Sequence, residues 1–402
     1  MKHKIIIKIL LFIVVFSQTG CWNKQELNEL AIALALGIDK VEEGYEVSVQ
    51  IVEPSQMALQ KPSERTPVTI FSETSTTLFE SLRKMVRLSS RRIYISHIHL
   101  ILLNEAAAKE GISETIDLLI RDHEMRPDFY FAIAHGQSAK DTLSIMTPLE
   151  TLPAMDFYNS LQMAKKYSAR ISSDRVTDVL RKLNKSGIEP VLSGLTITGD
   201  LEEGNSIENV QLLNSPANFT FKSIGVLKEG KLTGWLTEDE AVTYNFLNNQ
   251  IKNMLLNVSC PNEEEEAVLE VVSSDTKKKP RLSIDNEMSM FIEIDIEAHL
   301  GEIHCQTQLK SQKDFDYFQD FATEELSKQF LSNIKSVQSN HESDIFGFGE
   351  DIRMNFPNKW KEMKTSWNST FKTLNTEVNI TLNIRDLGKI INPINEMFEE
   401  PE

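Results

Sequence analysis

Cys21 stands where a lipid could be attached to the chain. It follows a basic start and the apolar run 9–16 (ILLFIVVF), which is the pattern of a signal peptide and is too short to span a bilayer. Gly20 before the cysteine fits a lipidation site, whereas Gln18 occupies a position where an aliphatic residue is usual. We therefore predict a lipoprotein signal peptide over residues 1–20 and a thioether-linked diacylglycerol on Cys21.

The other two cysteines, Cys260 and Cys305, form no recognisable framework. They could pair in an oxidising compartment, but two cysteines do not make the dense disulfide pattern of small secreted domains. We expect two unpaired thiols, and pairing remains the alternative.

The histidines suggest a metal site only weakly. His97 and His99 are two apart on a predicted strand and would share a face, which is half of a possible site. Two histidines that lie on a half-buried strand and bind no metal explain this spacing better. The sequence also lacks the G-x-S-x-G, P-loop, H-E-x-x-H and C-x-x-C signatures of common catalytic and metal sites. We predict no catalytic residue, no metal and no cofactor.

The charged segment 121–126 (RDHEMR) places basic and acidic side chains close together along the chain. An acid and base pair is one interpretation, but no nucleophile accompanies it. We expect Arg121 and Arg126 to pair with Asp122, Glu124 or more distant acids in a buried structural network. The alternative is a docking surface for a partner.

The acidic composition limits the partners of the chain. Its net charge is −17, and removal of residues 1–20, which hold three lysines and no acid, would lower the charge to −20. Such a chain repels nucleic acid and anionic lipid headgroups. We therefore expect no nucleic-acid partner, and we expect membrane attachment to come from the lipid on Cys21 and not from a basic patch.

The elements that would position these residues mix helices and strands. Residues 24–36 suggest a helix or a helix leading into a strand, 93–103 a buried strand, and 105–120 a helix broken at Gly111. Segments 219–227 and 231–236 have the pattern of a hairpin.

Later in the chain, Thr237 and Glu240 form a capping box that predicts a helix over 237–257. Apolar residues from Phe315 to Val337 recur every three or four positions and predict a long helix. Without regular alternation of strand and helix, these elements predict an α+β fold. The predicted units after the signal peptide are an N-terminal α+β domain (21–185), a small middle domain of hairpins and one helix (186–260) and a C-terminal α+β domain (261–402).

Several segments together resemble the Ger(x)C family, the lipoprotein C subunits of spore nutrient-germinant receptors. The segments are 21–27 (CWNKQEL), 92–97 (RIYISH), 121–126 (RDHEMR), 234–241 (GWLTEDEA) and 346–349 (FGFG) followed by Trp360 and Trp367. Each is weak alone, but five in this order after a lipoprotein signal are specific to the family.

This resemblance implies a role without catalysis. Such C subunits lie on the outer surface of the spore's inner membrane, the spore form of the bacterial cytoplasmic membrane. They assemble there with two integral-membrane subunits, A and B, into a receptor that responds to nutrients. The resemblance also implies three α+β domains.

Two other functions are compatible with an exported lipoprotein. A solute-binding protein of a transporter would require two doubly wound lobes with regular strand and helix alternation, which the sequence does not predict. An exported enzyme would require a pocket in which catalytic side chains converge.

Overall fold

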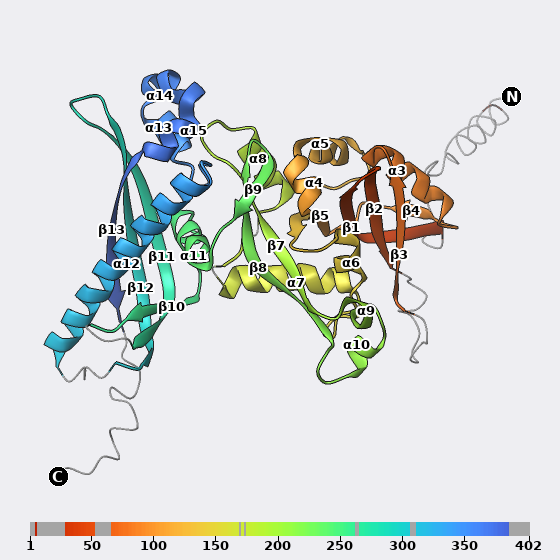
Figure 1. The fold of residues 1–402 in the computed structure, drawn as a ribbon, viewed down its shortest axis with the longest axis horizontal. Helices are drawn as coiled ribbons and strands as arrows, with labels where there is room; N and C mark the ends of the chain where they lie inside the picture. Colours follow the sequence, from red (N-terminus) through yellow and green to blue (C-terminus); the bar gives the residue numbers. More distant parts are fainter. Residues whose placement is uncertain are drawn as a thin grey trace, which may run out of the picture.

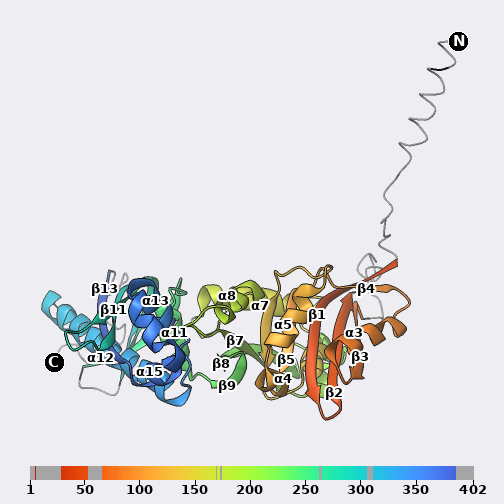
Figure 2. The same ribbon diagram turned by 90° about the horizontal axis from the view of Figure 1, so that it is seen from above.

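The structure is a computed structural model that describes residues 29–52, 66–168, 170–172, 174–261, 265–305 and 311–385, together with Ile5. Figures 1 and 2 show an elongated molecule with two β-sheets, one towards each end. Helices and strands are mixed in both units, so the predicted α+β fold is confirmed.

The first sheet has nine strands and is mixed in direction. The central pairs β1–β5, β5–β6 and β6–β7 are parallel, while the outer pairs are antiparallel and β4 pairs with the start of β1. In spatial order its strands are β3 (Val68–Ser75), β2 (Gly44–Val52), β1 (Leu30–Val41) with β4 (Arg92–Tyr94), β5 (Leu100–Asn104), β6 (Tyr130–Ala134), β7 (Val191–Gly199), β8 (Ala217–Lys228) and β9 (Lys231–Trp235).

Helices cover both faces of this sheet, which explains why its central strands are apolar on both sides. One apolar core lies under α3, α4, α5 and α8, and the other lies under α6 and α7. The helices of this part of the chain are α3 (Leu78–Lys84), η2 (Met85–Arg87), α4 (Glu105–Glu110), α5 (Ser113–Arg121), α6 (Ala139–Ser144), α7 (Pro153–Tyr167), α8 (Val176–Leu183), α9 (Leu201–Gly204) and α10 (Glu208–Gln211).

Of the two predictions for 24–36, a continuous helix is wrong, because Leu30 begins the central strand β1, whereas a helix leading into a strand is compatible with the described part. This strand is buried on both faces, and a short apolar run of this kind has no period that separates strand from helix. The predicted single strand 93–103 is two strands, β4 and β5, separated by a turn. The break at Gly111 between α4 and α5 and the hairpin β8–β9 are confirmed.

The second sheet has four strands in the order β10–β11–β12–β13. The first three strands are antiparallel, and β13 returns parallel to β12 after a helical crossover. Its elements are α11 (Glu238–Leu247), β10 (Met254–Ser259), β11 (Glu266–Leu282), β12 (Met288–Ile303), α12 (Gln312–Asn340), α13 (Phe348–Asn355), α14 (Pro357–Met363), η3 (Lys364–Ser366), α15 (Trp367–Thr373) and β13 (Asn375–Ile384).

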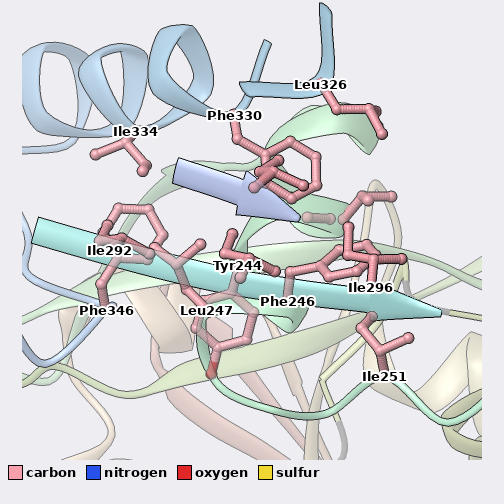
Figure 3. Close-up of a cluster of buried hydrophobic side chains, with 14 of the residues drawn as sticks. Tyr244, Phe246, Leu247, Ile251, Ile292, Ile296, Leu326, Phe330, Ile334 and Phe346 are labelled. Atoms are coloured by element: carbon pink, nitrogen blue, oxygen red, sulfur yellow. The ribbon is translucent and has the colours of Figure 1, made fainter. Parts of the chain in front are cut away.

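The long helix α12 lies across this sheet, as its apolar period predicts. Figure 3 shows Leu326, Phe330 and Ile334 of α12 on one side of the core, with Ile292 and Ile296 of β12 opposite. Helix α11 is buried on nearly all sides, with Tyr244 and Phe246 inside the same core. Its predicted capping box is confirmed, since the backbone N–H of Thr237 donates to the Glu240 side chain and the N–H of Glu240 donates to the Thr237 hydroxyl. The predicted extent to residue 257 is wrong, because the helix ends at Leu247 and Met254 begins β10.

Cys260 and Cys305 form a disulfide, so the expectation of two unpaired thiols is wrong. Cys260 follows β10 and Cys305 follows β12. Both strands pair antiparallel with β11, so their carboxyl-terminal ends lie at the same edge of the sheet. Sequence spacing could not reveal this pairing, because it depends on the order of strands in the sheet.

The predicted boundary at residue 186 does not coincide with a boundary between sheets. Strands β7, β8 and β9 continue the nine-stranded sheet of the N-terminal part, whereas α11 and β10 belong to the second core and sheet. The segment 186–260 is therefore shared between the two sheets.

Candidate functional site

The two histidines considered as half of a metal site, His97 and His99, do not converge on a metal-binding position. His97 is exposed, and His99 is half-buried beside the ring of Tyr158. Burial lowers the pKa of His99, which favours its neutral form. Among the described residues, no group of three histidine, cysteine or carboxylate side chains is placed to hold a metal ion.

The 121–126 cluster lies at the exposed end of α5, so the prediction of a buried network is wrong. Arg121 pairs with Asp117 one turn earlier at 2.7 Å, and 75% of its side chain is exposed. Arg126 lies 3.9 Å from Asp128, also at the surface. The predicted end of the helix at residue 120 agrees with the end of α5 at Arg121, but the sequence did not show that the following turn faces solvent.

Within this cluster, one residue makes a tertiary ion pair. Glu124 pairs with Arg92 of β4, and Ser96 donates a hydrogen bond to its backbone carbonyl. Asp122 accepts a hydrogen bond from the backbone N–H of Glu124 and so shapes the turn after α5. The interpretation of 121–126 as a docking surface stays a prediction.

We expect Arg121→Ala to leave the melting temperature unchanged within measurement error, because its ion pair is local and solvent-exposed. Thermal unfolding followed by circular dichroism would measure this. The matched control is Met125→Ala in the same segment, since Met125 is buried and its truncation should cost about 2–5 kcal/mol. If Arg121→Ala clearly lowered the melting temperature, that result would contradict this expectation and support a structural ion network.

Beside the cluster lies a groove between α3, η2, β4 and α5. Its volume is about 710 Å³. Apolar side chains such as Met85, Ile93 and Leu118 form its walls, and arginines, including Arg83 and Arg121, stand among them. Asp122 and Glu124 also line it, so the groove combines apolar walls with charges of both signs.

Among the described residues, sequence analysis missed one buried carboxylate that accepts several hydrogen bonds. Asp344 is 1% exposed and its carboxylate accepts four hydrogen bonds. The donors are the backbone N–H groups of Gly347 (2.8 Å), Phe348 (3.1 Å) and Gly349 (2.7 Å) and the Nε1–H of Trp367 (3.1 Å). Burial raises the pKa of Asp344 to about 6, against the effect of these donors.

These contacts explain the FGFG segment and the tryptophan that follows it. Gly347 has φ of 77°, a left-handed conformation that favours glycine, and it precedes α13. Asp344 thus caps the N-terminus of α13, where a negative charge is favourable. The sequence signal was weak, because Asp344 lies three residues before the N-cap position, Gly347, where a capping side chain is usually found.

The same loop joins the two sheets. Gly187, in the connection between α8 and β7, lies so close to Gly349 that a Cβ on Gly187 would be 2.7 Å from the Cα of Gly349. The carbonyl of Gly187 accepts from the N–H of Glu350, and the carbonyl of Asp344 accepts from the N–H of Glu189. We call residues 343–349 with Gly187 the junction.

A second buried contact ties the first sheet to α11. Lys182 of α8 donates hydrogen bonds to Asp174 and to the Tyr244 hydroxyl, the latter at 3.2 Å. Burial alone would lower the pKa of Lys182, but Tyr244 and Asp174 raise it above its ordinary value. This buried cation is therefore held in its charged form as part of the interface between the two units.

Cys21, the predicted lipidation site, lies outside the described residues. Within the described ranges, no helix is both long and apolar enough to cross a bilayer.

Comparison with known proteins finds similar proteins along the whole chain. A family model described as "Spore germination protein N-terminal domain" matches residues 23–197, and one described as "Spore germination B3/ GerAC like, C-terminal" matches residues 222–388. The chain is 30% identical to spore germination protein KC of Bacillus subtilis (strain 168), over all of both chains. It is 21% identical to spore germination protein B3 of the same organism, over 94% of this chain and 97% of that protein.

The fold agrees with this relationship. The crystal structure of the GerBC protein superposes with a TM-score of 0.56 at 18% sequence identity, covering 87% of this chain and 96% of that one. With both family domains matched in order and a relative similar along its full length, the chain belongs to the Ger(x)C family of spore germination proteins.

Proposed function

We propose that the chain is the lipid-anchored C subunit of a spore nutrient-germinant receptor, on the outer face of the spore's inner membrane. It acts there as a scaffold or signalling subunit beside integral-membrane A and B subunits and performs no catalysis. The observation that carries this proposal is the full-length similarity to spore germination protein KC. Relatives named spore germination proteins A3 and B3 also match over 94% of this chain.

The fold supports a scaffold more than a solute-binding protein. A transporter's binding protein has two doubly wound lobes around a ligand cleft. This chain instead has one mixed nine-stranded sheet and one four-stranded sheet. The junction and the Lys182 contact connect them through buried polar groups, which resist relative movement because separation would leave those groups unpaired. A rigid body of this kind can hold two partner surfaces at a fixed separation.

The short segment between Cys21 and β1, the tether, indicates how the subunit works. Leu30 begins the first described strand nine residues after Cys21, so an anchor on Cys21 keeps the body close to the membrane. A short tether raises the effective concentration of the body beside its partners to the order of millimolar. Weak docking to the A and B subunits is then sufficient.

We expect Cys21→Ala to yield a chain without lipid that is lost from the spore inner membrane, and germination with nutrients to fall. Overexpression should restore germination in part, because concentration replaces the tether. Mass spectrometry of the N-terminal peptide, membrane fractionation and a germination assay measure the three effects. A tagged unmutated chain should also co-purify with the A and B subunits.

The control is Gln18→Leu, which supplies the usual aliphatic residue and should keep or increase lipidation. Full membrane retention of Cys21→Ala would contradict the anchor. Absence of the A and B subunits from the tagged preparation would contradict the receptor assignment itself.

A further inference from the structure

The segment from Arg83 to Arg92 reverses the charge of the chain locally. It covers the end of α3, all of η2 and the start of β4. Its basic residues are Arg83, Lys84, Arg87, Arg91 and Arg92, and it contains no acid, although the chain as a whole has a net charge of −17. We call residues 79–92 the basic ridge; residues 79–82 add one acid, Glu80, to this segment.

Large apolar side chains are exposed between these cations. Phe79 is 50% exposed, Val86 64% and Leu88 42%. Arg83 lies over the ring of Phe79, 5.1 Å from its centroid. Exposed aromatic and aliphatic groups interleaved with arginine and lysine are typical of segments that lie in the interface of an anionic membrane.

The charges of another basic run in the chain are neutralised by carboxylates of the protein itself. On β11, Lys277, Lys279 and Arg281 each lie beside a carboxylate, of Asp275, Glu293 and Glu377 respectively. That run needs no external anion.

The basic ridge is paired less completely. Lys84 pairs with Glu80 and Arg92 with Glu124. Within the described ranges of the chain, no carboxylate lies within 4.0 Å of the guanidinium of Arg83 or Arg87, and both residues are exposed. These two cations can therefore meet an anion outside the protein.

The ridge lies next to the start of the folded body. Leu30, the first residue of β1, is paired with Arg92 of β4. In Figures 1 and 2, β4 and α3 lie at the end of the molecule opposite α12 and β13. Leu30 lies nine residues after Cys21, a span of at most about 30 Å when extended, so an anchor there brings the ridge to the membrane surface.

We propose that the basic ridge is a second membrane contact that binds the headgroups of anionic phospholipids and inserts Phe79, Val86 and Leu88 at the interface. This proposal rests on the membrane location proposed above, but not on the receptor partners. It gives the tethered body one orientation, in which the second sheet points away from the anchor. It also replaces the expectation that an acidic chain attaches to anionic lipid only through its own acyl groups.

The test uses the full chain on vesicles, with an environment-sensitive dye on Val86→Cys. One set of vesicles is phosphatidylcholine, and the other contains phosphatidylglycerol. We expect a blue-shifted dye that is quenched by brominated lipid only with phosphatidylglycerol, and loss of the signal at about 1 M salt, where the Debye length is about 3 Å. The same dye on Leu255→Cys, an exposed site on β10, should not respond.

The charge requirement is tested by Arg83→Gln/Arg87→Gln in the labelled chain. Each cation near an anionic surface contributes about fivefold, so the ratio of membrane-bound to free dye should fall about 30-fold. The matched control, Lys277→Gln/Lys279→Gln, changes the net charge equally and should leave the ratio unchanged.

Identical spectra on both kinds of vesicle, or an equal loss in the matched control, would overturn the proposal. A response that requires the A and B subunits in the membrane would also overturn it and would assign the ridge and its groove to a protein partner. A chain that floats with phosphatidylglycerol vesicles but not with phosphatidylcholine would support the ridge while contradicting the lipid anchor, so the two claims fail separately.

Discussion

Replacing Asp344 with alanine is expected to lower the free energy of unfolding by about 3–5 kcal/mol, because the substitution strands buried donors. Three backbone N–H groups and the Trp367 indole would lose their acceptor in a site that is 1% exposed. The turn before α13 would also lose its cap. Since this turn contacts Gly187, the damage should extend to the connection between the two sheets.

Urea unfolding of the full chain, followed by circular dichroism and tryptophan fluorescence, would measure the loss. Asp344→Asn keeps one carbonyl acceptor and should lose less. Glu362→Ala, at an exposed acid on α14, is the control and should have no effect. A variant Asp344→Ala as stable as the unmutated chain would mean that water or a rearranged turn satisfies these donors.

Local signals in the sequence predicted local structure well. Thr237 and Glu240 cap α11 as the capping box predicts, and the apolar period from Phe315 to Val337 correctly gives the buried face of α12. Both signals depend on residues three or four positions apart, which interact within one helix whatever surrounds it.

Structural features that depend on contacts between distant parts of the chain could not be predicted from the sequence. Strand β1 is buried on both faces, so its apolar residues show no alternation. The composition change near residue 186 suggested a new domain, but β7 pairs with β6 and extends the first sheet. Net charge likewise concealed the basic ridge, because a sum over the whole chain carries no information about where the cations lie.

Two of the motifs that resemble the Ger(x)C family, 234–241 and 346–349, are structural in this chain. Phe346 and Phe348 are fully buried beside Asp344, and Trp235 stacks on His135 with ring centroids 4.0 Å apart. Residues of this kind specify the fold and the connection between the sheets. The other two described motifs, 92–97 and 121–126, lie at the surface, where Arg92 belongs to the basic ridge and the charges of 121–126 follow the end of α5.

Removal of the Cys260–Cys305 disulfide is expected to lower the free energy of unfolding by about 4 kcal/mol. The estimate follows from the chain entropy of a closed loop of 45 residues, which the cross-link removes from the unfolded state. Both cysteines are buried, at 1% and 7% exposure, so the covalent bond joins ends of β10 and β12 that are already packed. The loss should therefore appear as a lower unfolding midpoint without loss of the native fold.

The measurement compares urea midpoints of the unmutated chain, the same chain with dithiothreitol, and Cys260→Ala/Cys305→Ala. The two treatments should shift the midpoint alike, and the double variant should not respond to reductant. Cys21→Ser is the control, because it removes a thiol outside this pair. The result also bears on the proposed location, since a disulfide persists outside the reducing cytosol. Chain isolated from spore membranes should thus carry the disulfide, and quantitative alkylation of Cys260 and Cys305 in that material would contradict both the bond and the exported location.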